Sequence, residues 1–145
     1  MGYLMLSVIA ATALVVSISV HFMAWVNIDP PFHSLVPMLH VGAIILGIPL
    51  VLFAELTKPK TAGRNNLGHL FAEVPSWARV ACYCLFPYAV LNFIYFIYCT
   101  KLFPRHAVPF LVELRGFSGH WMLFYGWEAA GFLGLASFVG KRKEQ

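Results

Sequence analysis

Long apolar runs separated by short polar segments dominate the pattern of this sequence. Four stretches, at about residues 3–27, 35–56, 77–100 and 118–140, stay apolar over about 20 positions or more. A helix of about 20 apolar residues can cross a hydrocarbon core of about 30 Å. The pattern predicts an all-α, polytopic integral membrane protein with four transmembrane helices, forming a single membrane domain over residues 1–145.

Two loops carry apolar residues of their own. The segment 65–77, NNLGHLFAEVPSW, offers Asn66 as a helix N-cap and Pro75 just before the third span. The segment 106–116 offers Pro109 as a first helical residue and Gly116 as a helix stop. Both segments predict short interfacial helices that lie at the level of the lipid headgroups.

Composition and charge exclude several classes of protein. With 60% hydrophobic and 11% charged residues, the chain cannot fold as a soluble domain without exposing apolar surface to water. The net charge of +4 fits contact with anionic lipid headgroups. We therefore expect bound lipid and no nucleic-acid partner.

Basic residues are distributed unevenly around the four spans, which predicts the orientation. Seven of them flank the second and third spans or follow the fourth, against three on the other side: Lys58, Lys60, Arg64, Arg79, Lys141, Arg142 and Lys143, against Lys101, Arg105 and Arg115. By the positive-inside rule both termini are predicted to be cytoplasmic, in a bacterial inner membrane.

Three histidines are candidate ligands for a cofactor. His21 and His40 each fall on the small-residue face of their helix, and both lie nine or ten positions from the loop centre at Pro30 and Pro31. In an antiparallel hairpin they would lie at one depth, which suggests a paired site. His120 lies toward the same side of the membrane but closer to its surface.

The spacing of closely packed helices limits which cofactor these histidines could hold. Helix axes that approach to about 8 Å leave no room for a porphyrin between two imidazoles. A haem or chlorophyll-type tetrapyrrole with one axial histidine is easier to build, and a small metal ion is a further possibility whose identity stays unknown.

Glu128 lies close to the middle of the fourth span, where an ionisable side chain needs a partner, a proton or a water-filled cavity. The third span carries a stripe of polar residues at spacings of three and four, which includes Tyr88, Asn92 and Tyr95. Asn92 and Glu128 lie at matching depths by residue count. These four residues are therefore predicted to form a buried polar cluster.

Small residues predict where helices pack closely. Gly126, Ala130 and Gly134 form a ridge on the fourth span, about 160° from Glu128, and Gly47 lies on the small-residue face of the second span. Both faces of the fourth helix must then be covered. Because a four-helix monomer rarely surrounds one helix completely, either the site is a cavity inside the bundle or a partner protein covers it, and the partner is favoured.

No nucleophile triad, phosphate-binding glycine loop or His-Glu metal motif occurs at the right spacing, so nothing here indicates catalysis. The favoured function is a non-catalytic accessory or structural subunit of a larger membrane complex, redox or energy-transducing, with other subunits or further copies as partners. The alternatives are a haem- or chlorin-binding electron-transfer protein, and a small oligomeric transporter or proton pathway centred on Glu128.

Overall fold

The computed structural model describes residues 1–31, 34, 36–57, 68–103 and 108–143. Within these ranges the chain forms five helices: α1 (Gly2–Trp25), α2 (Met38–Thr57), α3 (Gly68–Ala72), α4 (Ser76–Thr100) and α5 (Phe110–Lys143). All except α3 are long and apolar enough to cross a membrane. The predicted all-α architecture with four spans is confirmed, and α3 is a short helix in the second loop, as expected.

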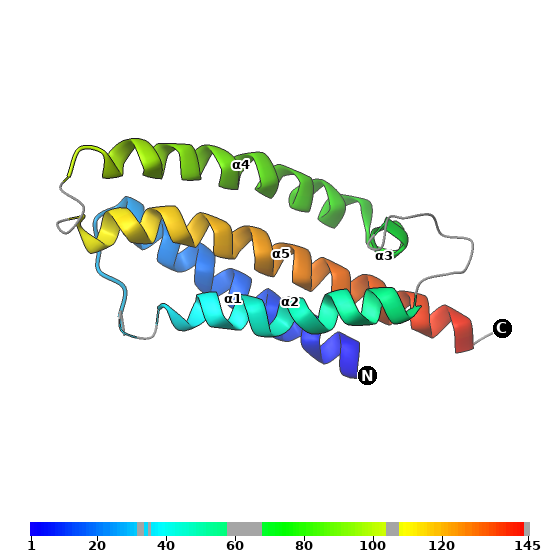
Figure 1. Cartoon of the computed structure of the whole chain (residues 1–145). Coiled ribbons are helices and arrows are strands. Elements are labelled where there is room, and N and C mark those ends of the chain that lie inside the picture. Colours follow the sequence, from blue (N-terminus) through cyan, green and yellow to red (C-terminus); the bar gives the residue numbers. More distant parts are fainter. Residues whose placement is uncertain (32–33, 35, 58–67, 104–107, 144–145) are drawn as a thin grey trace.

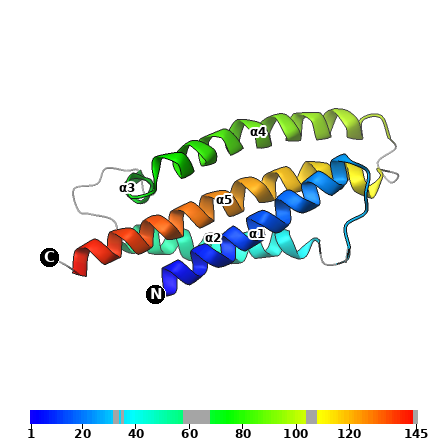
Figure 2. The same ribbon diagram turned by 180° about the vertical axis from the view of Figure 1, so that it is seen from behind.

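Helix α5 lies at the centre of the bundle. It lies between α4 on one side and the pair α1 and α2 on the other, and it also contacts α3 (Figures 1 and 2). In its most apolar stretch 44% of the residues are buried, against 17–22% in the other three spans. The other helices therefore share one central partner and turn their outer faces away from it.

The two ends of the bundle differ in what they hold. At one end lie α3, the first turns of α1 and α4, and the last turns of α2 and α5. At the other end lie the last turns of α1 and α4 and the first turns of α2 and α5 (Figure 1). This arrangement agrees with four crossings. The assignment of the first end to the cytoplasm stays a prediction, and Lys58, Lys60 and Arg64 lie outside the described residues.

Helix α1 packs on α5 through the small-residue face that the sequence predicted. Its buried positions are Ser7, Ala10, Ser17, Val20, His21 and Ala24. Polar bonds secure this contact near both of its ends. The Ser7 hydroxyl donates to the Ala129 carbonyl at 2.8 Å, and Arg115 donates through Nε to the Ala24 carbonyl at the end of α1. That carbonyl belongs to the last turn of α1, where carbonyls lack the regular i+4 bond, and it also accepts the backbone N–H of Asn27 at 3.4 Å.

The helix stop predicted at Gly116 is wrong, and the helix that contains the fourth span begins before residue 118. Helix α5 runs without a break from Phe110. Gly116 does not end the helix because its lack of a side chain serves packing: a Cβ there would lie 2.4 Å from a ring carbon of Phe96 in α4. The segment expected to lie on the membrane surface is the first part of α5, although residues 106 and 107 lie outside the described ranges.

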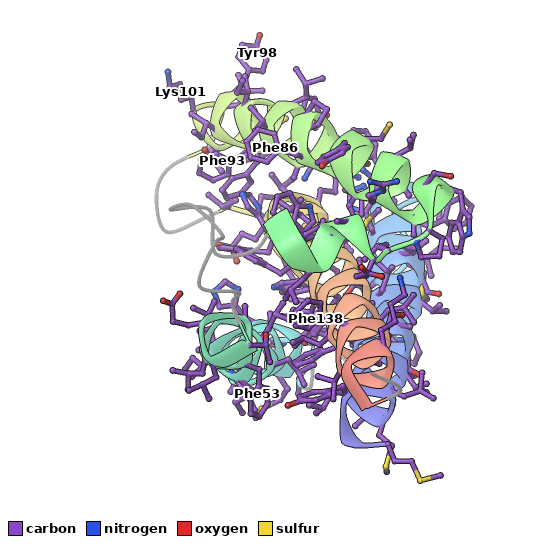
Figure 3. The ribbon with its side chains drawn as sticks, turned by 90° about the vertical axis from the view of Figure 1, so that its right-hand side faces the viewer. Phe53, Phe86, Phe93, Tyr98, Lys101 and Phe138 are labelled. Carbon is purple, nitrogen blue, oxygen red and sulfur yellow. The ribbon has the colours of Figure 1, made fainter. Side chains whose placement is uncertain are left out.

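The glycine and alanine ridge of α5 packs within the chain. Gly126 faces Leu85 of α4, Ala130 is buried among residues of α3 and α4, and a Cβ at Gly134 would meet the Leu70 carbonyl of α3. The opposite face, with Glu128, lies against Gly47 of α2. Figure 3 shows α2 and α4 well apart on either side of α5. The chain's own helices cover both faces, so the argument for a partner from the two-sided use of this helix no longer holds.

Candidate functional site

An open groove runs between α2 and α5, with a volume of about 490 Å³. We call it the α2–α5 groove. Its lining is apolar except for two side chains, and comprises His40, Ala43, Ile44, Gly47, Ile48, Val51, Leu52, Phe124 and Glu128. Volumes of about 300 to 1,000 Å³ with apolar walls and a few polar groups are typical of small-molecule sites.

Glu128 is the polar side chain at the inner end of this groove. Only 3% of its surface is exposed, and its Oε2 atom has no hydrogen-bond partner in the described part of the chain. A Cβ built on Gly47 would lie 3.2 Å from Oε1, so the glycine leaves room for the carboxyl beside α2. A buried carboxyl oxygen without a partner destabilises a protein by about 1 to 3 kcal/mol, which makes this atom a candidate ligand contact.

His40 is the second polar side chain of the groove. The indole N–H of Trp121 donates to its Nδ1 at 3.1 Å, and its ring lies edge-on to Phe117 with 6.0 Å between centroids. His40 also borders a second opening of about 440 Å³ between the first turns of α2 and α5, together with Val36, Pro37, Val41, Phe110, Glu113, Leu114, Phe117 and Trp121. It therefore stands where the two openings meet.

His21 lies on another side of α5, in a bonded network. Its Nδ1 donates to the Ser118 hydroxyl at 2.7 Å, because that hydroxyl already donates to the Leu114 carbonyl. Its Nε2 accepts from the Trp25 indole at 2.9 Å and from the Tyr88 hydroxyl. Both ring nitrogens are occupied, so a metal or tetrapyrrole could bind His21 only by displacing these partners.

The structure does not join the three candidate histidines. His21 and His40 bond different residues of α5, and no hydrogen bond connects the two rings. His120 bonds the Gly116 carbonyl of its own helix and lies edge-on to Phe93 of α4, with 4.9 Å between ring centroids. Among the described residues there is no group of three His, Cys, Asp or Glu that could hold a metal ion.

Asn92 does not partner Glu128, and that prediction is wrong. Its Nδ2 donates to the carbonyls of Arg115 and Gly116 at 2.6 and 3.2 Å. Gly116 lies twelve residues before Glu128, which is about 18 Å along one helix. Matching the depths by residue count failed because α5 starts earlier than expected, so the polar stripe of α4 meets an earlier part of α5.

The two tyrosines of the predicted cluster also lie apart from Glu128. Tyr88 bonds His21, and Tyr95 stacks on Trp25 with 5.3 Å between ring centroids. Each tyrosine is 40% exposed on the flank of α4. The four residues therefore do not form one cluster. Tyr88, Asn92 and Tyr95 contact α1 or the first part of α5, and Glu128 is the one member that lies at the groove.

Sequence reasoning missed three residues that shape these sites. Ser118 orients His21, Trp121 bonds His40, and the Tyr125 hydroxyl donates to the Leu39 carbonyl of α2 at 2.6 Å. Ser118 and Tyr125 lie seven residues apart, so they lie on one stripe of α5, which contacts α1 at Ser118 and α2 at Tyr125. That spacing of polar groups in an apolar helix was the available signal.

Searches with this chain gave no matching protein-family model and no significant match among curated proteins or solved structures.

Proposed function

We propose that this four-helix membrane protein is a non-catalytic binding protein that holds a lipid-soluble molecule in the α2–α5 groove. The observation that carries the proposal is the unpartnered Oε2 atom of Glu128, buried beside an open apolar groove of about 490 Å³. A bound molecule with a hydrogen-bonding group would satisfy this oxygen, and its apolar part would cover the walls.

The surroundings explain why the occupant carries a polar group. A plain acyl chain of the bilayer can fill the groove, but it offers no hydrogen bond. The Oε2 atom would stay unpartnered and would destabilise the protein as much as without the chain. Water would satisfy the oxygen, but a water molecule needs two to four polar partners, and apart from Glu128 the lining offers only His40 at the other end. An amphipathic molecule meets both requirements.

A pair of matched variants tests this function. Ile48 lines the groove and Ile45, one turn away, does not, although both are more than half exposed. The full-length protein, purified in mild detergent, is extracted with organic solvent, and the extract is analysed by mass spectrometry. We expect a stoichiometric small molecule with the parent and with Ile45→Trp, and its loss with Ile48→Trp, because the indole fills the groove.

The proposal is overturned if the parent protein carries nothing beyond bulk lipid and Ile48→Trp binds an added lipid-soluble probe as well as the parent does. It is also overturned if Ile48→Trp and Ile45→Trp retain the same molecule in the same amount, because the molecule would then bind elsewhere. Thermal unfolding of both variants in the same detergent shows whether each is folded.

A second candidate function is an accessory subunit of a larger redox or energy-transducing membrane complex. Helix α4 supports it, since its outer face presents large aromatic side chains, among them Trp77, Tyr83, Phe86 and Tyr98. Tyr98 and Lys101 point away from the bundle in Figure 3. Extraction in mild detergent, a native gel and mass spectrometry test this role: a defined larger species supports it, and a species of one chain contradicts it.

A tetrapyrrole-binding protein is a third candidate, in which a single histidine would be the axial ligand. His40 supports it, since Trp121 engages only Nδ1 and the aromatic rings of Phe117 and Trp121 lie beside the imidazole. The visible absorption spectrum of the purified protein decides the matter. A Soret or chlorin band that His40→Ala abolishes supports ligation, and a spectrum without visible bands contradicts it.

A further inference from the structure

We propose that the molecule held in the α2–α5 groove is a quinone in its oxidised form, bound through its two carbonyl oxygens. This inference rests on the proposed function, because it names the ligand class of the same groove. Three features carry it: the hydrogen-bonding character of His40, that of Glu128, and their separation along the groove.

The bond from Trp121 sets the role of His40. An indole nitrogen can only donate, so the Nδ1 atom that it contacts is the acceptor of the imidazole. In a neutral ring the other nitrogen, Nε2, then carries the hydrogen and is a donor. No hydrogen bond engages Nε2 in the described structure, and His40 borders the groove. The outer end of the groove therefore offers a hydrogen-bond donor.

The depth of Glu128 sets its role as well. It is the nineteenth of the 34 residues of α5, close to the middle of a helix that is long enough to cross the membrane. An ionised carboxylate at that depth is costly, and no described cation contacts it. The neutral acid costs far less in an apolar groove and carries an O–H that can donate. The inner end of the groove is therefore a second donor.

The two donors are separated by one ligand head group. Trp121, which holds His40, precedes Glu128 by seven residues, and His40 precedes Gly47 by seven, so both walls give a rise of about 10 Å between the two levels. A para-quinone presents acceptors at opposite edges of one ring. With a hydrogen bond of about 2.8 Å at each edge, it extends over roughly this length.

Other lipid-soluble classes fit these donors less well. A phospholipid would have to bring a charged headgroup to the middle of the bilayer. A quinol hydroxyl can accept from the Nε2–H of His40, but its own hydrogen would then find no acceptor side chain at that end of the lining. A lipophilic cation requires an ionised Glu128, in a lining that is otherwise apolar apart from His40. A neutral molecule with two acceptors matches both polar groups at once.

Tryptophan fluorescence reports the binding, because Trp121 bonds His40, which lines the groove, and quinones quench nearby indoles. The full-length protein in detergent is titrated with decylubiquinone. We expect saturable quenching with the parent and Kd within about threefold for Glu128→Gln, whose amide still donates. Glu128→Met and His40→Phe should each bind about tenfold more weakly, because each removes one hydrogen bond.

Matched variants and a second probe separate the alternatives. Glu73→Gln makes the same chemical change at an ion pair near the bundle end, and should leave the Kd unchanged. Titration with tetraphenylphosphonium tests for a cation site. If tetraphenylphosphonium binds and Glu128→Gln abolishes its binding, the carboxyl is ionised and the quinone assignment is overturned.

The quinone assignment and the binding function fail in different ways. If decylubiquinone gives no saturable quenching while another molecule co-purifies and is lost in Ile48→Trp, the groove binds a different class and only the assignment is overturned. If nothing co-purifies and Ile48→Trp binds decylubiquinone as the parent does, both are overturned. Equal affinity of the parent and Glu128→Met overturns the two-donor arrangement.

Discussion

The two sides of α5 differ in the bonds that their buried polar side chains make and in the space beside those side chains. Toward α1 and α4, His21 has partners at both ring nitrogens, and Asn92 donates through Nδ2 to two main-chain carbonyls. The buried Oδ1 atom of Asn92 has no partner in the described part of the chain, but Asn92 lines neither the α2–α5 groove nor the second opening. Toward α2, the Oε2 atom of Glu128 has no partner and the space beside it is open. In a membrane interior an unpartnered polar group is destabilising, because no bulk water replaces the missing bond. The first side makes most of its polar bonds and is closed, whereas the second keeps an unpartnered oxygen beside an open groove, as a ligand site would.

Among the variants that test this difference, His21→Ala is expected to cause the largest loss of stability. The change removes the bonds to Ser118, Tyr88 and Trp25 and leaves a cavity at a position that is only 6% exposed. We expect the free energy of unfolding in detergent to fall by about 2 to 4 kcal/mol, measured by denaturant titration with circular dichroism.

His40→Ala is the matched change on the groove side. His40 is exposed and makes one hydrogen bond, to Trp121, so its loss should lower the free energy of unfolding by less than about 1 kcal/mol. Equal losses for the two variants would contradict the division of α5 into a bonded side and an open side.

A methyl group added to one glycine on each side gives the next largest effect. At Gly119 a Cβ would lie 2.4 Å from Nδ2 and 3.0 Å from Cγ of Asn92, so Gly119→Ala must displace the amide from its carbonyl partners. We expect a loss of about 1 to 3 kcal/mol. At Gly47 the nearest atom is Oε1 of Glu128 at 3.2 Å, on a side chain that can move into the groove.

The same unfolding measurement on Gly47→Ala should therefore show a change within about 0.5 kcal/mol of the parent, with weaker ligand binding as the carboxyl shifts. A loss at Gly47 as large as that at Gly119 would show that the groove side is packed as tightly as the other.

Replacing the polar side chains by apolar ones should change the free energy of unfolding in opposite directions on the two sides of α5. Asn92→Leu deletes the bonds to the Arg115 and Gly116 carbonyls but also removes the unpartnered Oδ1 atom, so we expect a net loss of about 1 kcal/mol. Glu128→Met replaces a carboxyl whose Oε2 has no partner by an apolar side chain of similar length. Without ligand this variant should be as stable as the parent or more stable, because no bond is lost and an unpaired polar atom is removed.

Thermal unfolding of ligand-free samples in one detergent checks both variants. A clear destabilisation by Glu128→Met would mean that the carboxyl has a partner which contributes to the fold. The groove would then be a structural contact and not a ligand site.

Much of the fold followed from the sequence because membrane spans depend on length and apolarity alone. The position of His21 on the buried face of α1 was also predictable, since small residues and the histidine share one helical face. The partner of that face was not predictable. Helical periodicity gives the direction of a side chain on its own helix, but not which neighbouring helix lies there.

The surroundings of Glu128 show the same limit. Its central position in α5 was read correctly, but the start of that helix at Phe110 was not, and an error of eight residues displaced the expected contact with Asn92. Gly116 resembled a helix stop because a glycine that accommodates a neighbouring ring looks the same in sequence as one that ends a helix. Only the packing of Phe96 distinguishes the two.

The smallest effect is expected at the bundle end, where Lys141 of α5 forms an ion pair with Glu73, just after α3. The Lys141 side chain is 67% exposed, so water and salt compete for both charges. Glu73→Gln should lower the free energy of unfolding by less than about 1 kcal/mol, and the difference from the parent should shrink at high salt. Denaturant titrations at low and high salt measure this.

The bonds of His21 carry no net charge and lie inside the bundle, so the loss caused by His21→Ala should not change with salt. If salt reduced both losses equally, the His21 network would be open to water and the contrast between the two sides of α5 would not hold.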